Sequence, residues 1–367
     1  MLLTGYKDEL LSFLKEAPRK LDAVVMPDFF LDRLINLNCD PTCFFSMVKD
    51  VVDRKGGSID GVAQTEIRGG NAINTASALA ALGATVTPIV CTSKLGLQQI
   101  NFHLKPYHVG TSHIKLSKKA SLTTALELKT ENGKANVMLR DLGALADFGP
   151  SNLTDDDYDV IEQADYVCVF NWVGTRKFGT ELAQTVFRRA KAKGNGKTYY
   201  DTADPTPNRD KIPGLMEKVL KTRQVDILSV NENEAICYAA LLNKEISVQR
   251  GKLRFEELAM ESARVLAKHL QARIDLHTTS FSATFTAKSE TVVPAFKIQA
   301  LRATGAGDAW NAGNILGDGN GLSDERRLAL ANAVAACYLA DPEGTHPTRQ
   351  RLVKFIENSA KAWQAPR

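Results

Sequence analysis

The sequence predicts an α/β fold with a doubly wound, mostly parallel sheet and helices on both of its faces. After residue 165, apolar stretches of strand length alternate with stretches of helical periodicity, which is typical of parallel strands buried on both faces. Two glycine turns, Gly69-Gly70 and Gly305-Ala306-Gly307, each lead directly into a helical stretch. Two polar stretches, roughly residues 28–68 and 105–141, depart from this order. We therefore expect one domain over residues 1–367 with two excursions from its main body.

The first half of the chain carries strand, turn and helix signals in sequence. Residues 21–26 form an apolar run that Pro27 ends, which predicts a buried strand. Alanine and leucine favour a helix over residues 72–82, Gly83 stops it, and a strand follows over 85–90. We also expect an amphipathic helix over 7–15 and, within the excursions, a helix over 44–53, a strand over 62–67 and a hairpin of strands 121–129 and 134–140 around the turn Glu131-Asn132-Gly133.

The second half of the chain supplies most of the expected sheet. Short apolar runs bounded by polar residues predict the strands, and longer stretches with apolar residues three and four apart predict the helices. The strands are expected over 166–170, 197–200, 225–230 and 273–277, followed by a two-stranded stretch over 281–298. The helices are expected over 181–193, 232–242 and 255–270, after the glycine turn at 305–307, and over 323–339 and 348–362.

Composition excludes several classes of function. The 367 residues are 44% apolar and 24% charged, which is ordinary for a globular protein. The net charge of +4 is small, and basic residues such as Lys191, Lys193 and Lys197 are not gathered into aromatic-rich stripes, so we expect no nucleic-acid partner. The apolar run 328–340 contains Asn332 and is too short to span a bilayer. We expect a cytoplasmic protein without membrane contact.

The six cysteines do not suggest a disulfide framework or a zinc site. They are scattered and lie mostly in apolar runs, as expected of reduced, buried thiols. Cys39 and Cys43 are close in sequence, but no second cysteine or histidine pair with ligand spacing accompanies them.

The late glycine turn can hold an anion and place a base beside it. Gly305, Ala306 and Gly307 precede Asp308 at the start of a helix. The glycines allow a tight turn, and the first N–H groups of the helix have no internal acceptors, so they can bind phosphate oxygens. Asp308 would then face a hydroxyl beside that anion. The alternative is a glycine turn whose aspartate only caps the helix.

The two glycine motifs together resemble those of the ribokinase family of sugar and nucleoside kinases, also called the PfkB family. The motifs are Gly69-Gly70-Asn71-Ala72-Ile73-Asn74 and Gly305-Ala306-Gly307-Asp308, and their order, separation and following helices all agree with the family. The resemblance covers nearly the whole chain. It implies a ribokinase-like fold in which the two excursions form a small β lid that closes and excludes water. Because lid strands have open edges, a homodimer through the lid is a reasonable expectation.

The resemblance assigns the catalytic and acceptor residues. Asp308 inherits the role of general base, and the turn of Gly305, Ala306 and Gly307 that of the anion hole. A positioned carboxylate of this kind contributes roughly a hundred- to ten-thousand-fold to the rate. The implied acceptor-binding residues are Asp32, Gly69, Gly70, Asn71 and Asn74. Asn71 could instead cap a helix, and Asp32 could be a solvated surface residue, since Pro27 replaces the glycine usual five positions before it.

The resemblance also assigns the nucleotide side of the site. Asn231 and Glu234 match the family's Asn-x-x-Glu element, which organises Mg²⁺ on the nucleotide phosphates, here through water. The alternative is a helix start in which Glu232 and Glu234 favour the helix dipole. Thr304 and Asn332 are the implied nucleotide contacts, although the helix around Asn332 could be purely structural.

Three departures from the family pattern bear on specificity. Arg302 stands where many members carry an aspartate linked to a monovalent cation site, so activation by potassium is not expected. His277-Thr278-Thr279-Ser280-Phe281 replaces the usual glycine-containing nucleotide loop, so the donor could be ATP or ADP. Arg140 lies where the family's lid contacts substrate, and it could pair with a phosphate already present on the acceptor.

The sequence therefore predicts a magnesium-dependent kinase that phosphorylates a hydroxyl of a sugar, nucleoside or sugar phosphate. A non-catalytic binding protein with the same fold is the main alternative, motivated by the altered nucleotide loop. A dinucleotide oxidoreductase would need a Gly-x-Gly-x-x-Gly turn after the first strand, and Met26-Pro27-Asp28-Phe29 provides none.

Overall fold

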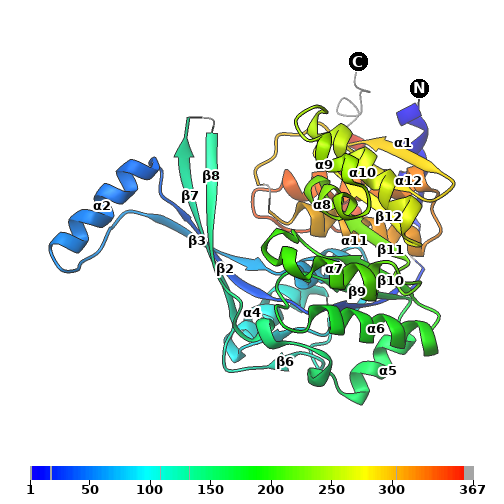
Figure 1. The fold of residues 1–367 in the computed structure, drawn as a ribbon, viewed down its shortest axis with the longest axis horizontal. Helices are drawn as coiled ribbons and strands as arrows, with labels where there is room; N and C mark the ends of the chain where they lie inside the picture. Colours follow the sequence, from blue (N-terminus) through cyan, green and yellow to red (C-terminus); the bar gives the residue numbers. More distant parts are fainter. Residues whose placement is uncertain (1, 17–18, 108, 132, 303, 359–367) are drawn as a thin grey trace.

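An eight-stranded sheet forms the centre of the molecule (Figure 1). The computed structural model describes residues 2–16, 19–107, 109–131, 133–302 and 304–358. The strand order is β14-β13-β12-β11-β10-β9-β1-β4, with parallel pairing from β4 to β12 and antiparallel pairing from β12 to β14. The strands are β1 Asp22–Met26, β4 Thr85–Pro88, β9 Tyr166–Phe170, β10 Lys197–Asp201, β11 Ile227–Val230, β12 Arg273–His277, β13 Phe281–Phe285 and β14 Glu290–Pro294.

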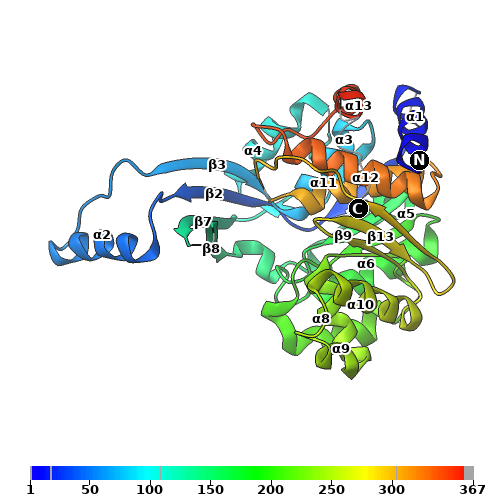
Figure 2. The same ribbon diagram turned by 90° about the horizontal axis from the view of Figure 1, so that it is seen from above.

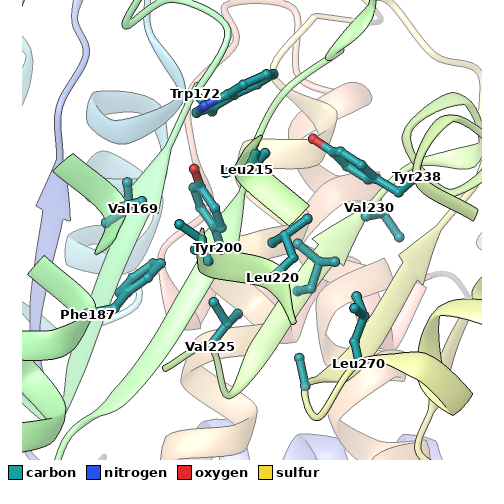
Figure 3. Close-up of a cluster of buried hydrophobic side chains, with 14 of the residues drawn as sticks. Val169, Trp172, Phe187, Tyr200, Leu215, Leu220, Val225, Val230, Tyr238 and Leu270 are labelled. Atoms are coloured by element: carbon teal, nitrogen blue, oxygen red, sulfur yellow. The ribbon is translucent and has the colours of Figure 1, made fainter. Parts of the chain in front are cut away.

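Helices cover both faces of this sheet, as Figure 2 shows from above. One face carries α1 Leu2–Lys15, α3 Asn71–Ala81, α11 Ala306–Gly319, α12 Asp324–Leu339 and α13 Arg349–Asn358. The other carries α5 Asp155–Gln163, α6 Gly179–Lys193, α7 Ile212–Leu215, α8 Glu232–Leu242, α9 Lys244–Val248 and α10 Phe255–His269. Buried aromatic and aliphatic side chains fill the second interface, among them Phe187, Tyr200, Leu220 and Tyr238 (Figure 3). This arrangement confirms the predicted doubly wound fold.

A second, four-stranded sheet projects from one edge of the body as the lid (Figure 1). Its order is β3-β2-β7-β8, and its strands are β2 Phe30–Asn36, β3 Ala63–Gly69, β7 Ser121–Thr130 and β8 Gly133–Asp141. Helix α2, Pro41–Asp53, lies at its far end and has no buried residue. The lid strands β2 and β3 connect directly to β1 and α3 of the body, so the lid and the body meet at Asp28 and at the Gly69-Gly70 turn.

Short elements complete the chain. A two-stranded sheet pairs β5 Cys91–Thr92 with β6 Lys115–Leu116, and α4 Lys94–Leu104 lies between them in sequence. Tight 3-10 turns span Lys105–Tyr107, Gly143–Asp147, Pro150–Asn152 and Thr206–Lys211, and a π-helical turn spans Met216–Leu220. Over the part of the chain that the structure describes, no helix has the length and apolarity needed to cross a bilayer.

The structure adds elements that the sequence analysis did not predict. Strand β2 was not predicted, and neither were helices α4 and α5. The last helix ends at Asn358, while residues 359–362 of its predicted range lie outside the described residues, as does Asn132 of the predicted hairpin turn. The hairpin strands themselves are β7 and β8, paired antiparallel as expected.

Candidate active site

The N-terminus of α11 has the geometry of an anion site. Gly305 is its N-cap residue in the left-handed conformation, with φ 82°. A side chain there would also collide with Tyr338, whose hydroxyl would lie 2.6 Å from a Cβ atom. Both features require glycine. Helix α11 then begins at Ala306, so the N–H groups of Ala306, Gly307 and Asp308 belong to its first turn and lack intrahelical acceptors.

Asp308 lies in this first turn and is almost fully buried, with 5% of its surface exposed. Its carboxylate accepts two hydrogen bonds of 2.9 Å, from Nδ2 of Asn71 and from Nδ2 of Asn74. Burial, together with the negative charges of Asp201 and Asp28, raises the pKa of Asp308 to about 7, although the hydrogen bonds from the two amides oppose the shift. The carboxylate is thus held by two amides and can exchange a proton near neutral pH.

Arg68 fixes the orientation of Asn74, and the sequence analysis did not identify it. The Arg68 Nε group donates to Oδ1 of Asn74 at 3.1 Å, so the amide nitrogen of Asn74 must face Asp308. The guanidinium also donates to Ser77 Oγ at 2.8 Å and lies 3.0 Å from His346 Nδ1. Its position directly before the Gly69-Gly70 motif was the only sequence signal for this role.

Asp28, rather than Asn71, caps helix α3. Its carboxylate accepts the main-chain N–H groups of Asn71 and Ala72, both at 2.9 Å, and Nδ2 of Asn171 at 2.7 Å. The capping role that was considered for Asn71 therefore falls to Asp28, which leaves the Asn71 amide free to bind Asp308. Burial raises the pKa of Asp28. Asp28 and Asn171 follow β1 and β9, neighbouring strands whose carboxyl ends meet at the acceptor side of the site.

Asp32 lies on the lid, in register with Thr123 and Arg140 on the next two strands. Its Oδ1 atom is buried without a partner among the described residues. Burial raises the pKa of Asp32 to about 6. A side chain at Gly69 would overlap the Asp32 carboxylate, so the first glycine of the motif is needed to admit that group. Arg140 is exposed and lies over the Phe30 ring, 5.0 Å from its centroid.

Asn231 and Glu234 are brought together at the start of α8, where they form a reciprocal capping box. Asn231 Oδ1 accepts the Glu234 N–H at 3.0 Å, and the Glu234 carboxylate accepts the Asn231 N–H at 3.0 Å and its Nδ2 group at 2.8 Å. The helix-start alternative is therefore realised in the geometry. The capping box is compatible with binding of a hydrated metal ion. Burial and the negative charges of Asp201, Asp204 and Glu232 disfavour the ionised form of Glu234 and raise its pKa, and a nearby cation would favour that form.

This group of carboxylates fits a hydrated cation rather than a directly coordinated one. Among the described residues, no three His, Cys, Asp or Glu side chains are placed to hold a metal ion directly. The mutual repulsion around Glu234 is nevertheless the electrostatics that a nearby cation relieves, and Mg²⁺ often keeps several waters while bridging phosphates. The residues present thus fit Mg²⁺ bound through water.

The two remaining nucleotide-side residues differ in their surroundings. Thr304 is exposed and its main-chain oxygen accepts the Tyr338 hydroxyl at 3.3 Å. The Asn332 side chain is fully engaged by the protein: it accepts from Ser282 Oγ and Trp310 Nε1 and donates to the main chain of β14. These hydrogen bonds fix the Trp310 indole against β14.

Arg302 is tied to the loop that follows α12. Its Nη2 atom donates to the main-chain oxygens of Asp341 and Pro342, each at 2.7 Å. The guanidinium charge of Arg302 is therefore directed at these two main-chain carbonyl groups. The neighbouring Ala303 lies outside the described residues.

The fold and site define a ribokinase-type α/β protein with a four-stranded lid sheet and a glycine turn at the N-terminus of α11. A model of the pfkB family of carbohydrate kinases matches residues 44–351. The chain belongs to this family, and it is thus a phosphotransferase with an alcohol group as acceptor. A search of curated proteins found no match.

Solved structures of the same fold include kinases for different acceptors. The adenosine kinase from Sinorhizobium meliloti has a TM-score of 0.68 at 19% identity, over 94% of this chain and 100% of that chain. A fructokinase with bound ATP from Xylella fastidiosa has a TM-score of 0.68 at 16% identity, over 93% and 100%. A ribokinase from Cryptococcus neoformans in complex with ADP has a TM-score of 0.67 at 17% identity, over 92% and 99%. At these identities, the structural likeness shows the fold alone.

Proposed function

We propose that this protein is a magnesium-dependent kinase that transfers the terminal phosphoryl group of ATP, or of ADP, to a hydroxyl of a sugar, nucleoside or sugar phosphate. One observation carries the proposal: the Asp308 carboxylate stands in the first turn of α11 while two amides from α3, the helix after the lid hinge, hold it in place. A proton acceptor and an anion site thus lie within one helical turn, at the junction of body and lid.

In the proposed reaction, Asp308 takes the proton of the acceptor hydroxyl as the hydroxyl oxygen bonds to the terminal phosphorus of the nucleotide. The bond from that phosphorus to the bridging oxygen breaks, and ADP leaves when ATP is the donor, or AMP when ADP is. The N–H groups of Ala306, Gly307 and Asp308 would stabilise the charge on the transferring phosphoryl oxygens. Asn71 and Asn74 keep the carboxylate aimed at the acceptor, and Arg68 prevents the Asn74 amide from turning over. These groups are already in place before the substrate binds. Little entropy is then lost in arranging them during the reaction, which lowers the barrier.

Magnesium would be held on the nucleotide side by Asn231 and Glu234 through water. When bound, it would offset the negative charge of the nucleotide phosphates. The buried Glu234 carboxylate and its neighbours Asp201 and Asp204 supply the negative potential that retains it.

The acceptor would bind beneath the lid, against Asp32 and the Gly69-Gly70 hinge. The unpartnered Oδ1 of Asp32 suits a sugar hydroxyl, because a hydroxyl donor would satisfy an oxygen that is otherwise buried without a hydrogen bond. Arg140, in register with Asp32 two strands away, would suit a phosphate carried by the acceptor. Lid closure would keep water from competing for the phosphoryl group.

A matrix of acceptors and donors tests this proposal. Sugars, nucleosides and sugar phosphates are each incubated with ATP, ADP or GTP, with and without Mg²⁺, and phosphorylated product is measured. We expect Mg²⁺-dependent product from at least one acceptor with an adenine nucleotide. Saturable binding of acceptor and nucleotide with no product under any donor would instead favour a non-catalytic binding protein.

A further inference from the structure

His277 presents a buried, unpartnered nitrogen next to the candidate anion site. It is the last residue of β12, where the sequence departs from the family's glycine-containing loop. Its Nε2 atom is buried and has no hydrogen-bond partner among the described residues. A buried polar nitrogen without a hydrogen-bond partner destabilises the folded protein. A ligand that accepts a hydrogen bond would remove that cost.

The ring is aimed at the first turn of α11. A Cβ atom placed on Gly307 would lie 3.3 Å from His277 Cε1 and 3.9 Å from Nε2, so this edge of the ring faces the glycine of the anion turn. The ring also packs against Trp310, at 5.0 Å between ring centroids and with an angle of 35° between the ring planes. Trp310 is itself fixed by the Asn332 side chain, so the ring is held against a rigid wall.

The charge state of the ring suits a donor rather than a cation. Burial lowers the pKa of His277, although the negative charges of Asp201 and Asp275 oppose that shift. The imidazole is therefore neutral at physiological pH, with one N–H that can reside on Nε2. A neutral N–H group beside a helix N-terminus recognises an anionic oxygen.

We propose that His277 is a further phosphate-binding residue of this chain, whose Nε2–H donates to an oxygen of the nucleotide phosphates at the N-terminus of α11. The inference rests on the proposed function, because it requires a nucleotide at that turn. The family pattern places a glycine in this segment, whereas here the His277 side chain would make the contact with the phosphate. The competing interpretation is that the ring only packs on Trp310.

Two substitutions separate these interpretations. His277→Phe keeps an aromatic ring against Trp310 but removes the donor, whereas His277→Gln restores an N–H at a similar reach. His269→Phe, at an exposed histidine of α10, is the control. Affinity is measured by calorimetry for the β,γ-imido analogue of ATP with Mg²⁺, for ADP, and for adenosine, which has no phosphates.

We expect His277→Phe to weaken the analogue at least about tenfold, since hydrogen bonds to charged groups are the stronger class. Adenosine should bind it like wild type, and His277→Gln should recover most of the loss. Equal affinity of wild type and His277→Phe for the analogue would overturn the inference, as would a similar loss for analogue and adenosine. If the wild-type protein binds neither the analogue nor ADP, the proposed kinase function is itself contradicted, and the role of His277 falls with it.

A measurement on the wild-type protein covers the case in which His277→Phe does not fold. With ¹⁵N-labelled histidine, the His277 Nε2 resonance, assigned with His277→Gln, should shift on adding the analogue and stay unchanged with adenosine. An unshifted resonance at saturating analogue would contradict the proposal.

Discussion

At the residue scale, the site depends on how neighbouring groups orient and tune one carboxylate. The sequence pointed to Asp308, Asn71 and Asn74 through the motifs that resemble the family, and the structure brings the three side chains together. The two asparagines donate to the carboxylate, however, whereas the resemblance had assigned them to the acceptor. The sequence could not predict Asp28 or Arg68. Asp28 caps α3 from 43 residues away in the sequence. Arg68 is only 6 residues from Asn74, but it binds a side chain whose orientation is fixed only by the tertiary structure.

The raised pKa of Asp308 predicts a pH-dependent reaction. A general base must be ionised, and below a pKa of about 7 the ionised fraction falls tenfold per pH unit. We therefore expect kcat/KM of the wild-type enzyme to rise with pH up to about 7 and then level off. Initial rates measured from about pH 5.5 to 9 with a non-limiting coupling system provide the check. A flat profile down to pH 5.5 would show that a group of ordinary carboxyl pKa, or none, limits the reaction.

The same shift has the opposite sign for stability. Because the folded-state pKa of Asp308 lies above the ordinary value of 3.8, the native protein binds this proton more tightly than the unfolded chain. The contribution of Asp308 to stability is therefore fully present below pH about 4 and is lost as the pH rises towards 7. The site thus gains a base near neutral pH at some cost in folding stability.

At the element scale, strands and helices with strong local patterns were predicted, and elements with weak ones were not. Helix α5 has the acidic sequence Asp155-Asp156-Asp157 in its first turn and little apolar periodicity, although its capping box of Thr154 and Asp157 was a usable signal. Strand β2 was not predicted, because its residues lack the regular alternation of apolar and polar side chains that is typical of a half-buried strand. Its strand pairing with β3 and β7 is set by the lid as a whole.

The hinge between the lid and α3 requires glycine at position 70. Gly70 has φ 96°, and a Cβ there would lie 2.7 Å from Phe29 Cα and 2.9 Å from the Asp28 main-chain oxygen. We expect Gly70→Ala to lower the free energy of unfolding by more than about 1 kcal/mol, and to lower kcat/KM, because the backbone of Asp28 and Phe29 must shift. Chemical denaturation and initial rates measure the two effects.

Gly61→Ala is the matched control for this hinge. Gly61 also has a positive φ, 76°, but an added Cβ would meet nothing within 4 Å. It isolates the backbone term from the steric one. If both variants lose the same stability and Gly70→Ala keeps full activity, close packing at the hinge is not what positions the site.

At the scale of the whole molecule, the lid sheet exposes an edge strand and apolar side chains to solvent. Strand β8 is an edge of the lid sheet, and Val137 and Leu139, on the face opposite Arg140, are 45% and 57% exposed. The sequence predicted that a lid exists, since the Asn-Gly turn marks a hairpin. It also predicted a helix over residues 44–53, which the structure shows as α2, but not that none of its residues is buried.

We predict that two copies of the chain associate through their lids, because edge strands and exposed apolar side chains are covered by pairing with another chain. Sedimentation velocity should detect a dimer of wild type at micromolar concentration. The double substitution Val137→Lys with Leu139→Lys should give a monomer with an unchanged unfolding temperature. Phe102→Lys, at a 77% exposed residue of α4, serves as the control and should remain dimeric. A monomeric wild type, or a double variant that stays dimeric, would refute lid pairing.

The most direct test of the account is phosphoryl transfer by Asp308→Asn, compared with wild type in the presence of Mg²⁺, the best acceptor and the best donor. Asp50→Asn, at an exposed aspartate of α2, controls for loss of one negative charge. If Asp308 is the base, the variant should bind nucleotide with near wild-type affinity while its turnover falls by at least about a hundredfold. Turnover within a few-fold of wild type would remove Asp308 from the chemistry and with it the mechanism proposed for this fold.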